Sequence, residues 1–211
     1  MNELTAGYVP VIEEICAYDY PALTAEQLSL VAWAYHAFSV QFRENLITAL
    51  ELYPDDTQLQ KLVVEECATD NLSPWPGVAA PGEKMDHDAF MGRALLLSPI
   101  DPGLRARAQA AGQAYLRRVR GADELTKAMS IASYEAGGLE AVFTAFLRAR
   151  CWDTPLLHAF RHFLLKHIQF DSDPDQGHGA LCRHLVPDSR IRPMWLAFRD
   201  LLVEVVPQIT G

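Results

Sequence analysis

Two side chains that could bind a metal share one predicted helix. His167 and Asp171 follow Phe160 and Leu164 at helical spacing, so they should lie on the face that the helix buries. A buried carboxylate is costly unless something pairs with it, and a metal ion would satisfy both side chains. A lone histidine on such a face is more often an ordinary hydrogen-bonded core residue, so the metal interpretation depends on further residues.

A third candidate ligand follows a turn-rich stretch, SDPDQG, which leads to His178. Pro174 in this stretch cannot continue a helix, so the helix should end just after Asp171 and His178 should approach from a loop. A ligand on a loop is held less rigidly than one on a helix, and its metal should bind more weakly. Asp173 and Asp175 compete with Asp171 as the carboxylate ligand.

Acidic residues and a histidine also occupy core-like positions elsewhere. Glu135 interrupts the apolar stripe of a predicted helix over residues 123–150, although its carboxylate could instead reach solvent at the edge of the stripe. Glu65 and Glu66 end another helix, and the helical period favours Glu66 as the inward one. His87 follows a proline-rich loop, where the alternative is an exposed first-turn histidine.

Taken jointly, these residues form a set of carboxylates and imidazoles from different helices. Helix bundles build di-iron and di-manganese sites from inward-facing sets of this kind. The predicted metal ligands are Glu65, His87, Glu135, His167, Asp171 and His178.

The elements that must position these ligands are predicted to be helices. Thr24 and Gln27 have capping-box spacing and open the longest helix, which Pro54 ends. No alternating run is flanked by hairpin turns, and the proline-rich stretch 70–82 should be a loop that covers the mouth of a site. We expect an all-α, single-domain bundle of about seven or eight helices. The predicted helices span residues 8–18, 24–53, 57–68, 86–98, 101–120, 123–150 and 154–171, a short segment near Ala180, and 192–206.

Composition excludes several classes of function. The formal net charge of −9 argues against a nucleic-acid partner, which needs clustered basic residues. The four cysteines form no CxxC pair, which favours reduced thiols. The chain shows no signal peptide and no stretch long enough to cross a membrane. We expect a cytoplasmic protein that binds a small molecule and does not bind a membrane. If the protein assembles, we expect a homodimer.

The order of these motifs resembles a known family. LVVEECATDN, HDAFM, SYEAGG and HIQFDSDPDQGHGAL succeed one another as they do in the haem-oxygenase-like di-iron oxidases and oxygenases, relatives of the TenA thiaminases and the pyrroloquinoline-quinone synthases. The resemblance covers roughly residues 30–185. It makes Glu65 rather than Glu66 the ligand. The chain departs from the family in a longer Glu-to-His interval and in the SDPDQG insertion before His178.

The resemblance implies a haem-oxygenase-like fold without haem that binds two Fe(II) ions and uses O2 as co-substrate. Its substrates would be small, commonly amino acids or fatty acids, and the outcomes hydroxylation, N-oxygenation, desaturation or C–C cleavage, as in a biosynthetic pathway. An amino-acid substrate needs a cation for its carboxylate, for which Arg161, Lys166 and Arg183 lie near the metal helix in sequence. Plausible pocket residues are His36, Phe38, Trp75 and Tyr134.

Rival interpretations keep the fold and change the chemistry. One is a metal-free enzyme like TenA or the quinone synthases, and another is a haem-binding protein with His36 as axial ligand. A third is an interaction protein with a vestigial site. A buried Glu135 without a charge partner would make that third case costly.

Overall fold

The computed structural model describes residues 7–171, 177–182 and 184–211, with only the backbone of Asp171 included. The predicted roles of Asp171, Asp173, Asp175 and Arg183 as side chains therefore lie outside the described residues. The prediction for His178 can be examined.

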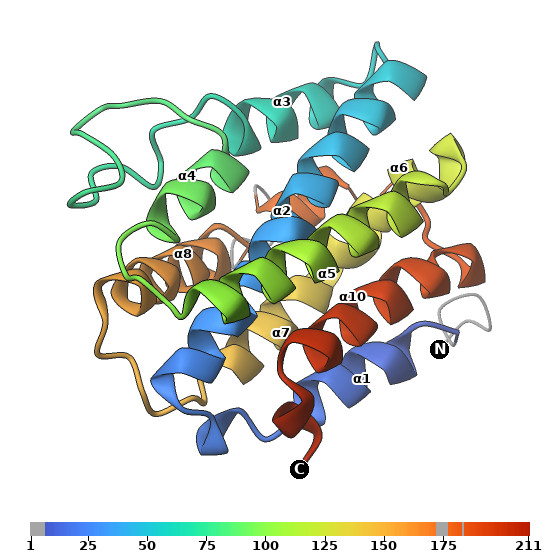
Figure 1. Cartoon of the computed structure of the whole chain (residues 1–211). Helices are drawn as coiled ribbons and strands as arrows, with labels where there is room; N and C mark the ends of the chain where they lie inside the picture. The colour runs from blue at the N-terminus through green and yellow to red at the C-terminus, as the bar shows by residue number, and fades with distance from the viewer. Residues whose placement is uncertain (1–6, 172–176, 183) are drawn as a thin grey trace.

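The described chain folds into helices, with no β-strand among the residues covered (Figure 1), which confirms the all-α prediction. The α-helices are α1 (Val9–Ala17), α2 (Ala25–Leu52), α3 (Thr57–Glu66), α4 (His87–Ala94), α5 (Pro102–Arg120), α6 (Glu124–Ser133), α7 (Leu139–Phe146), α8 (Pro155–Asp171), α9 (His178–Leu181) and α10 (Arg192–Val205). Short 3₁₀ segments are η1 (Tyr20–Ala22), η3 (Ser189–Ile191) and η4 (Pro207–Thr210), and η2 (Tyr134–Gly138) is a π-helical segment.

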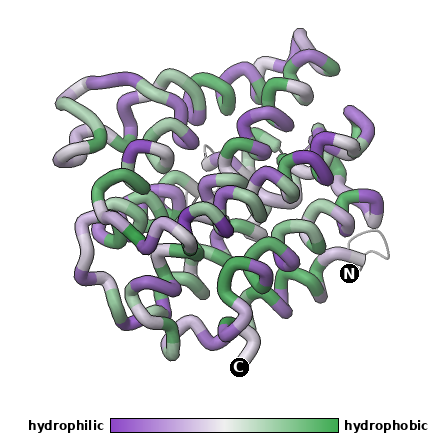
Figure 2. Tube along the Cα trace, in the orientation of Figure 1, coloured by the Kyte–Doolittle hydropathy of each residue, from purple (hydrophilic) through white to green (hydrophobic). Residues whose placement is uncertain are grey.

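The long helix α2 is the centre of the bundle. Its N-terminus carries the predicted capping box, in which the Gln27 amide donates to Thr24 Oγ1 and the Thr24 amide donates to Gln27 Oε1. α2 packs against α3, α4, α5, α6, α8 and α10, so its buried positions meet neighbours on several sides. Figure 2 shows hydrophobic and hydrophilic residues interspersed along the helices, as expected of helices with one buried and one exposed face.

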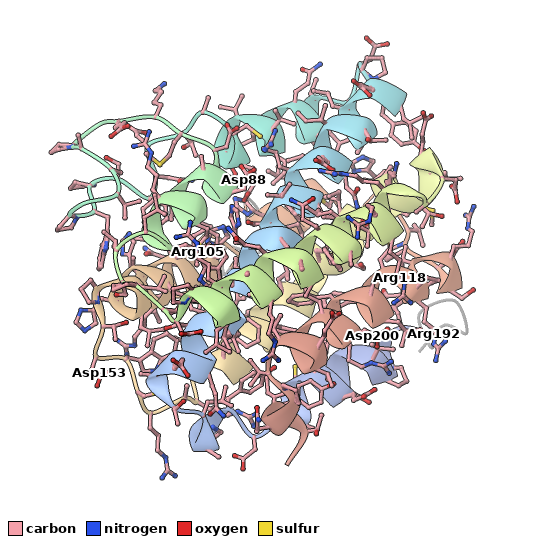
Figure 3. All side chains as sticks on the ribbon, in the orientation of Figure 1. Asp88, Arg105, Arg118, Asp153, Arg192 and Asp200 are labelled. Atoms are coloured by element: carbon pink, nitrogen blue, oxygen red, sulfur yellow. The ribbon has the colours of Figure 1, made fainter. Side chains whose placement is uncertain are left out.

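α5 and α10 lie side by side on one face of α2 (Figure 1). Arg118 on α5 donates to Asp200 on α10 at 2.8 Å, and Figure 3 shows the two labelled side chains next to one another. This pair is exposed, so packing rather than the ion pair stabilises the contact between the two helices. Of the helices in the described residues, none is long and apolar enough to cross a membrane.

The prediction of one continuous helix over residues 123–150 is wrong. The chain makes a π-helical turn at η2, with Ala136 outside helical geometry and Gly137 at φ +94°, a conformation that favours glycine. Tight packing supports the distortion, because a Cβ on Gly138 would clash with the Ser133 carbonyl oxygen and lie 2.9 Å from Trp195 Cζ2. π-turns are rare and often mark functional sites, and this one carries Glu135.

Residues 67–86 form the predicted loop between α3 and α4, and both helices end earlier than expected, α3 at the start of the loop and α4 at the end away from the loop. α3 ends at Glu66 because Ala68 turns the chain with φ +50°, and α4 ends at Ala94. Two backbone hydrogen bonds join Thr69 and Met85 and close the base of the loop. The loop packs against α8, where the ring of Trp75 stacks on His162 with centroids 4.4 Å apart.

Candidate metal centre

Glu66, His87 and His167 converge in the interior of the bundle. Each offers one ligand atom, and these three atoms all lie within 4.8 Å of one another. Glu66 Oε2 is 2.7 Å from His87 Nδ1, and His87 Nδ1 is 2.9 Å from His167 Nε2. The three residues come from the end of α3, the start of α4 and the middle of α8, and all are buried.

Hydrogen bonds on the outer side of each imidazole orient its inner nitrogen. His167 Nδ1 lies 2.8 Å from the Phe163 carbonyl oxygen, to which it can only donate. His87 Nε2 lies 2.9 Å from Asn71 Oδ1, and Asn71 is fixed in that orientation because its Nδ2 donates to the Glu65 carbonyl oxygen. In the neutral tautomers set by these bonds, Nε2 of His167 and Nδ1 of His87 carry lone pairs directed at each other.

The protonation states favour a cation at this point. Burial, reinforced by His87, lowers the pKa of His167 to about 3, so its imidazole is neutral near neutral pH. Burial would raise the pKa of Glu66, but the charge of His87 and the hydrogen bond from it, followed by His178, outweigh burial and lower that pKa to about 2. A proton on His87 Nδ1 can point at either Glu66 Oε2 or His167 Nε2. A divalent cation would bind these two atoms and His87 Nδ1 at once.

A second group of ligand atoms lies on the other side of Glu66. His178 Nδ1 is 3.2 Å from Glu66 Oε1 and 3.2 Å from Glu135 Oε2. Glu66 Oε1 is buried and forms no hydrogen bond with the described residues. Glu66 therefore presents one oxygen to each group, which is the arrangement expected of a carboxylate that bridges two metal ions.

The structure corrects the choice of Glu65 as the inward carboxylate. Glu66 occupies that place, as the helical period indicated. Glu65 lies at the rim, 3.4 Å from His178 Nε2 and 3.7 Å from Lys61, with its side chain 31 % exposed. Hydrogen bonding to His178, followed by the charges of His178 and Lys61, holds the pKa of Glu65 below its usual range.

The other predicted ligands in the described residues are near the cluster. His87, Glu135, His167 and His178 are all buried, so the exposed alternatives for His87 and Glu135 do not apply. His178 begins the short helix α9 instead of lying in a loop. The described part of α8 runs to Asp171, and the predicted effect of Pro174 lies outside the described residues.

Asn71 orients a candidate ligand although its sequence position does not single it out. It belongs to the loop and contacts His87, but no residue of the loop lines the cavity among the described residues, so the predicted covering role stays a prediction. The unusual length of the loop does not separate Glu66 from His87, since the Thr69–Met85 hydrogen bonds return the chain at its base. Only a structure could have identified Asn71, because nothing in its sequence spacing distinguishes it from other loop amides.

Aromatic rings pack around the cluster. The Phe163 ring stacks on His167 with centroids 4.0 Å apart, and Phe143 meets His167 edge-on at 5.8 Å. Phe170 lies 5.9 Å from His178. The enclosed cavity has a volume of about 20 Å³, room for roughly one water molecule or an ion. Its lining residues are Tyr35, Ser39, Phe42, Arg43, Glu66, His87, Asp88, Glu135, Leu139, Phe163 and His167.

The residues predicted to line a substrate pocket lie elsewhere. Tyr134 and Phe38 pack against each other in the core, with ring centroids 4.9 Å apart. His36 abuts α4, where a Cβ on Gly92 would lie 3.2 Å from its Nε2. Trp75 covers α8 from the outside. Tyr134 and Phe38 are therefore packing residues, which was the alternative interpretation, whereas His36 lines a separate pocket between α2 and α5.

Comparisons with protein-family models, with curated proteins and with solved structures found no match for this chain. The resemblance to the haem-oxygenase-like di-iron family therefore stays a prediction, and the arguments below depend on the site.

Proposed function

We propose that this protein is a non-haem iron enzyme that binds two Fe(II) ions at Glu66 and uses O2 to oxidise a small molecule. The observation that carries the proposal is the convergence of Glu66 Oε2, His87 Nδ1 and His167 Nε2, with the outer nitrogens of both imidazoles already hydrogen-bonded. Two histidines and one carboxylate are the ligand set typical of non-haem Fe(II) oxygenases.

The second position supports a pair of ions over a single one. Glu66 Oε1, Glu135 and His178 would hold the second ion, and Glu66 would bridge the two. Glu66 and Glu135 are both buried, and a divalent cation beside each would offset the cost of burying a carboxylate. The bound metal pair would supply the redox chemistry with O2.

The chain's own residues would set the conditions for that chemistry. Asn71 and the Phe163 carbonyl hold the two imidazoles in the tautomers that bind metal. Phe143, Phe163 and Phe170 keep water away, which limits loss of oxidising equivalents to side reactions. The π-turn places Glu135 beside His178.

Two rival functions are less well supported by the geometry. A haem group does not fit the cavity of about 20 Å³ beside Glu66, His87 and His167, since pockets for ligands of that size span hundreds of Å³. His36 lines a separate pocket of about 520 Å³ between α2 and α5, so a haem bound there would not use the Glu66 cluster. In a metal-free acid–base enzyme a single proton on His87 Nδ1 could satisfy only one of its two neighbours, Glu66 Oε2 and His167 Nε2.

Metal binding by the full chain tests the proposal. Protein made metal-free and then titrated anaerobically with Fe(II), Mn(II) or Zn(II) should bind about two ions per chain. Fe(II) should raise the melting temperature, because a ligand that binds only the folded state at a hundred times its Kd adds about 2.7 kcal/mol. His158→Ala, an exposed change on the same helix as His167, is the control and should bind metal normally.

The results of these measurements distinguish the proposed iron enzyme from a hydrolytic zinc enzyme and from a haem protein. An unchanged melting temperature with excess Fe(II), or no bound metal by elemental analysis, would refute the proposal. Exclusive binding of Zn(II) without O2 consumption would indicate a hydrolytic site instead. A Soret absorption band in protein as purified would support the haem alternative.

A further inference from the structure

The wall of the metal cavity contains one pair of opposite charges. Arg43 on α2 and Asp88 on α4 both line the cavity that Glu66, His87 and His167 enclose. Arg43 Nε lies 2.9 Å from Asp88 Oδ1 and 3.0 Å from Oδ2. Asp88 directly follows the candidate ligand His87, and Figure 3 labels it at the start of α4 beside α2.

The pair lies at the outer end of the cavity. The Arg43 side chain is 36 % exposed, and of the described lining residues it alone is not buried. The cavity holds only about one water molecule, so a substrate can enter only if a wall residue moves. Arg43 has the flexible side chain and the exposure to do so, which places it where solvent meets the metal site.

The Nη groups of Arg43 can donate further hydrogen bonds. Its Nε contacts Asp88 and lies 3.7 Å from Asp86, while both Nη groups form no hydrogen bond with the residues that the structure covers. A guanidinium has five N–H donors and binds carboxylates through two parallel hydrogen bonds. Asp88 in turn can accept further bonds from an ammonium group. Asp86 is engaged in structure, since it accepts from the Ala68 amide.

The cations expected from the sequence do not serve this role. Arg161 is exposed and Lys166 donates to Gln169, and neither lines the cavity. Arg43 could not be inferred from proximity to the metal helix along the chain, because it reaches the cavity from α2.

On the basis of the proposed function, we propose that Arg43 and Asp88 select a zwitterionic α-amino acid as the substrate. The carboxylate would accept hydrogen bonds from the Nη groups of Arg43, and the ammonium would donate to Asp88. Two opposite charges match a zwitterion, so the net charge at the cavity mouth does not change on binding. A fatty acid would bring one uncompensated anion beside Asp88 and Asp86.

Ligand binding to the Fe(II)-loaded full chain, kept anaerobic, tests the proposal. The twenty common L-amino acids are screened by thermal shift, and the best binder is compared by calorimetry with laurate and with two analogues of itself. One analogue is the amine that lacks the carboxylate, and the other is the acid that lacks the amino group. The variants are Arg43→Gln and Asp88→Asn. The control is Arg120→Gln, which removes an exposed Arg–Glu ion pair between α5 and α2.

We expect the amino acid to bind 10- to 100-fold more weakly to Arg43→Gln and to Asp88→Asn, as for a lost hydrogen bond to a charged group. Arg43→Gln should leave the affinity for the amine unchanged, and Asp88→Asn should leave that for the acid unchanged. Arg120→Gln should behave as wild type. If Asp88→Asn fails to fold, the proposal is tested by the affinity of Arg43→Gln for the amino acid and by the affinity of the wild-type protein for the two analogues.

Three results would overturn the proposal. They are an amino-acid affinity within about twofold of wild type in metal-loaded Arg43→Gln, tighter binding of laurate than of every amino acid, or no binding of any amino acid. A wild type that takes up no metal refutes the proposed function separately. Amino-acid binding would then be measured on that metal-free protein, with the same criterion for Arg43→Gln.

Discussion

The two sides of Glu66 differ in how firmly they hold their side chains. On one side, His87 and His167 are fixed by hydrogen bonds on their outer nitrogens, and His167 lies in the middle of the long helix α8. On the other, Glu135 lies in a π-turn and His178 opens a helix of four residues. We call these the rigid side and the distorted side.

The difference indicates that the two candidate metal positions should differ in their affinity for the ion. Ligands held in place before binding lose less conformational freedom when the metal arrives, so the rigid side should bind its ion more tightly. The sequence led to the same ranking through the proline that precedes His178, but the structure adds the π-turn at Glu135 as a second reason. The predictions below run from the change that removes both positions to the change that perturbs one.

The largest effect should come from Glu66→Gln. Glu66 is the residue that both sides share, and its amide replacement keeps the size but loses the bridging charge, so both metal equivalents should be lost in elemental analysis. Glu65→Gln is the matched control from the same helix end and should retain the ion on the rigid side. Equal losses in the two variants would contradict the assignment of Glu66.

The next effect separates the two sides. His167→Ala should remove the ion on the rigid side, and His178→Ala only the one on the distorted side, because each imidazole lies with one group of ligand atoms. Stepwise anaerobic Fe(II) titration followed by Mössbauer spectroscopy should show unequal filling in wild type and one remaining site in His178→Ala. Two sites that fill with equal affinity in both proteins would rule out the distinction.

A smaller effect should follow from Asn71→Ala. The variant removes the hydrogen bond that orients His87, and loss of such a partner typically weakens metal binding by about 10- to 100-fold. The titration should show this loss on the rigid side. Ser73→Ala, which removes a hydroxyl that donates to a carbonyl within the same loop, is the control. Unchanged metal affinity in Asn71→Ala would mean that the tautomer of His87 is fixed by other means.

The smallest effect should be confined to the distorted side. A Cβ at Gly179 would lie 2.7 Å from the Glu135 carbonyl oxygen, so Gly179→Ala should push α9 away from η2 at a cost of about 1–3 kcal/mol. Binding of the second ion should weaken while the first is retained, as measured by the same titration and by thermal unfolding. Gly121→Ala meets its nearest atom at 3.4 Å and should cost less. Normal binding of both ions by Gly179→Ala would show that α9 does not position His178.

The sequence predicted those features of the fold that local rules decide. The capping box at Thr24, Pro102 at the start of α5 and the buried stripe of α8 were all visible, because caps and apolar periods act over a few residues. The π-turn was not, because it depends on Gly138 meeting Trp195, which lies far away in the chain. An apolar period that is counted across such a turn assigns the residues after the turn to the wrong face of the helix.

The site was partly predictable for the same reason. His87, Glu135, His167 and His178 were found as polar residues at positions that should be buried, and their burial is confirmed. The choice between Glu65 and Glu66 was decided by an alignment of motifs, and the helical period would have given the residue that lies inside. Their roles as metal ligands stay predictions.

The closed base of the loop between α3 and α4 has a consequence for how the protein can be altered. Two hydrogen bonds join Thr69 to Met85, so the spacing between Glu66 and His87 is set at this short neck, while the rest of the loop contacts α8 through Trp75 and α4 through Glu83. The segment around Gly82, where a Cβ would meet no atom within 4 Å, lies on the far side of the neck. An epitope or a fluorescent reporter inserted there would lengthen the loop beyond the Thr69–Met85 hydrogen bonds. The distance between Glu66 and His87 would stay the same.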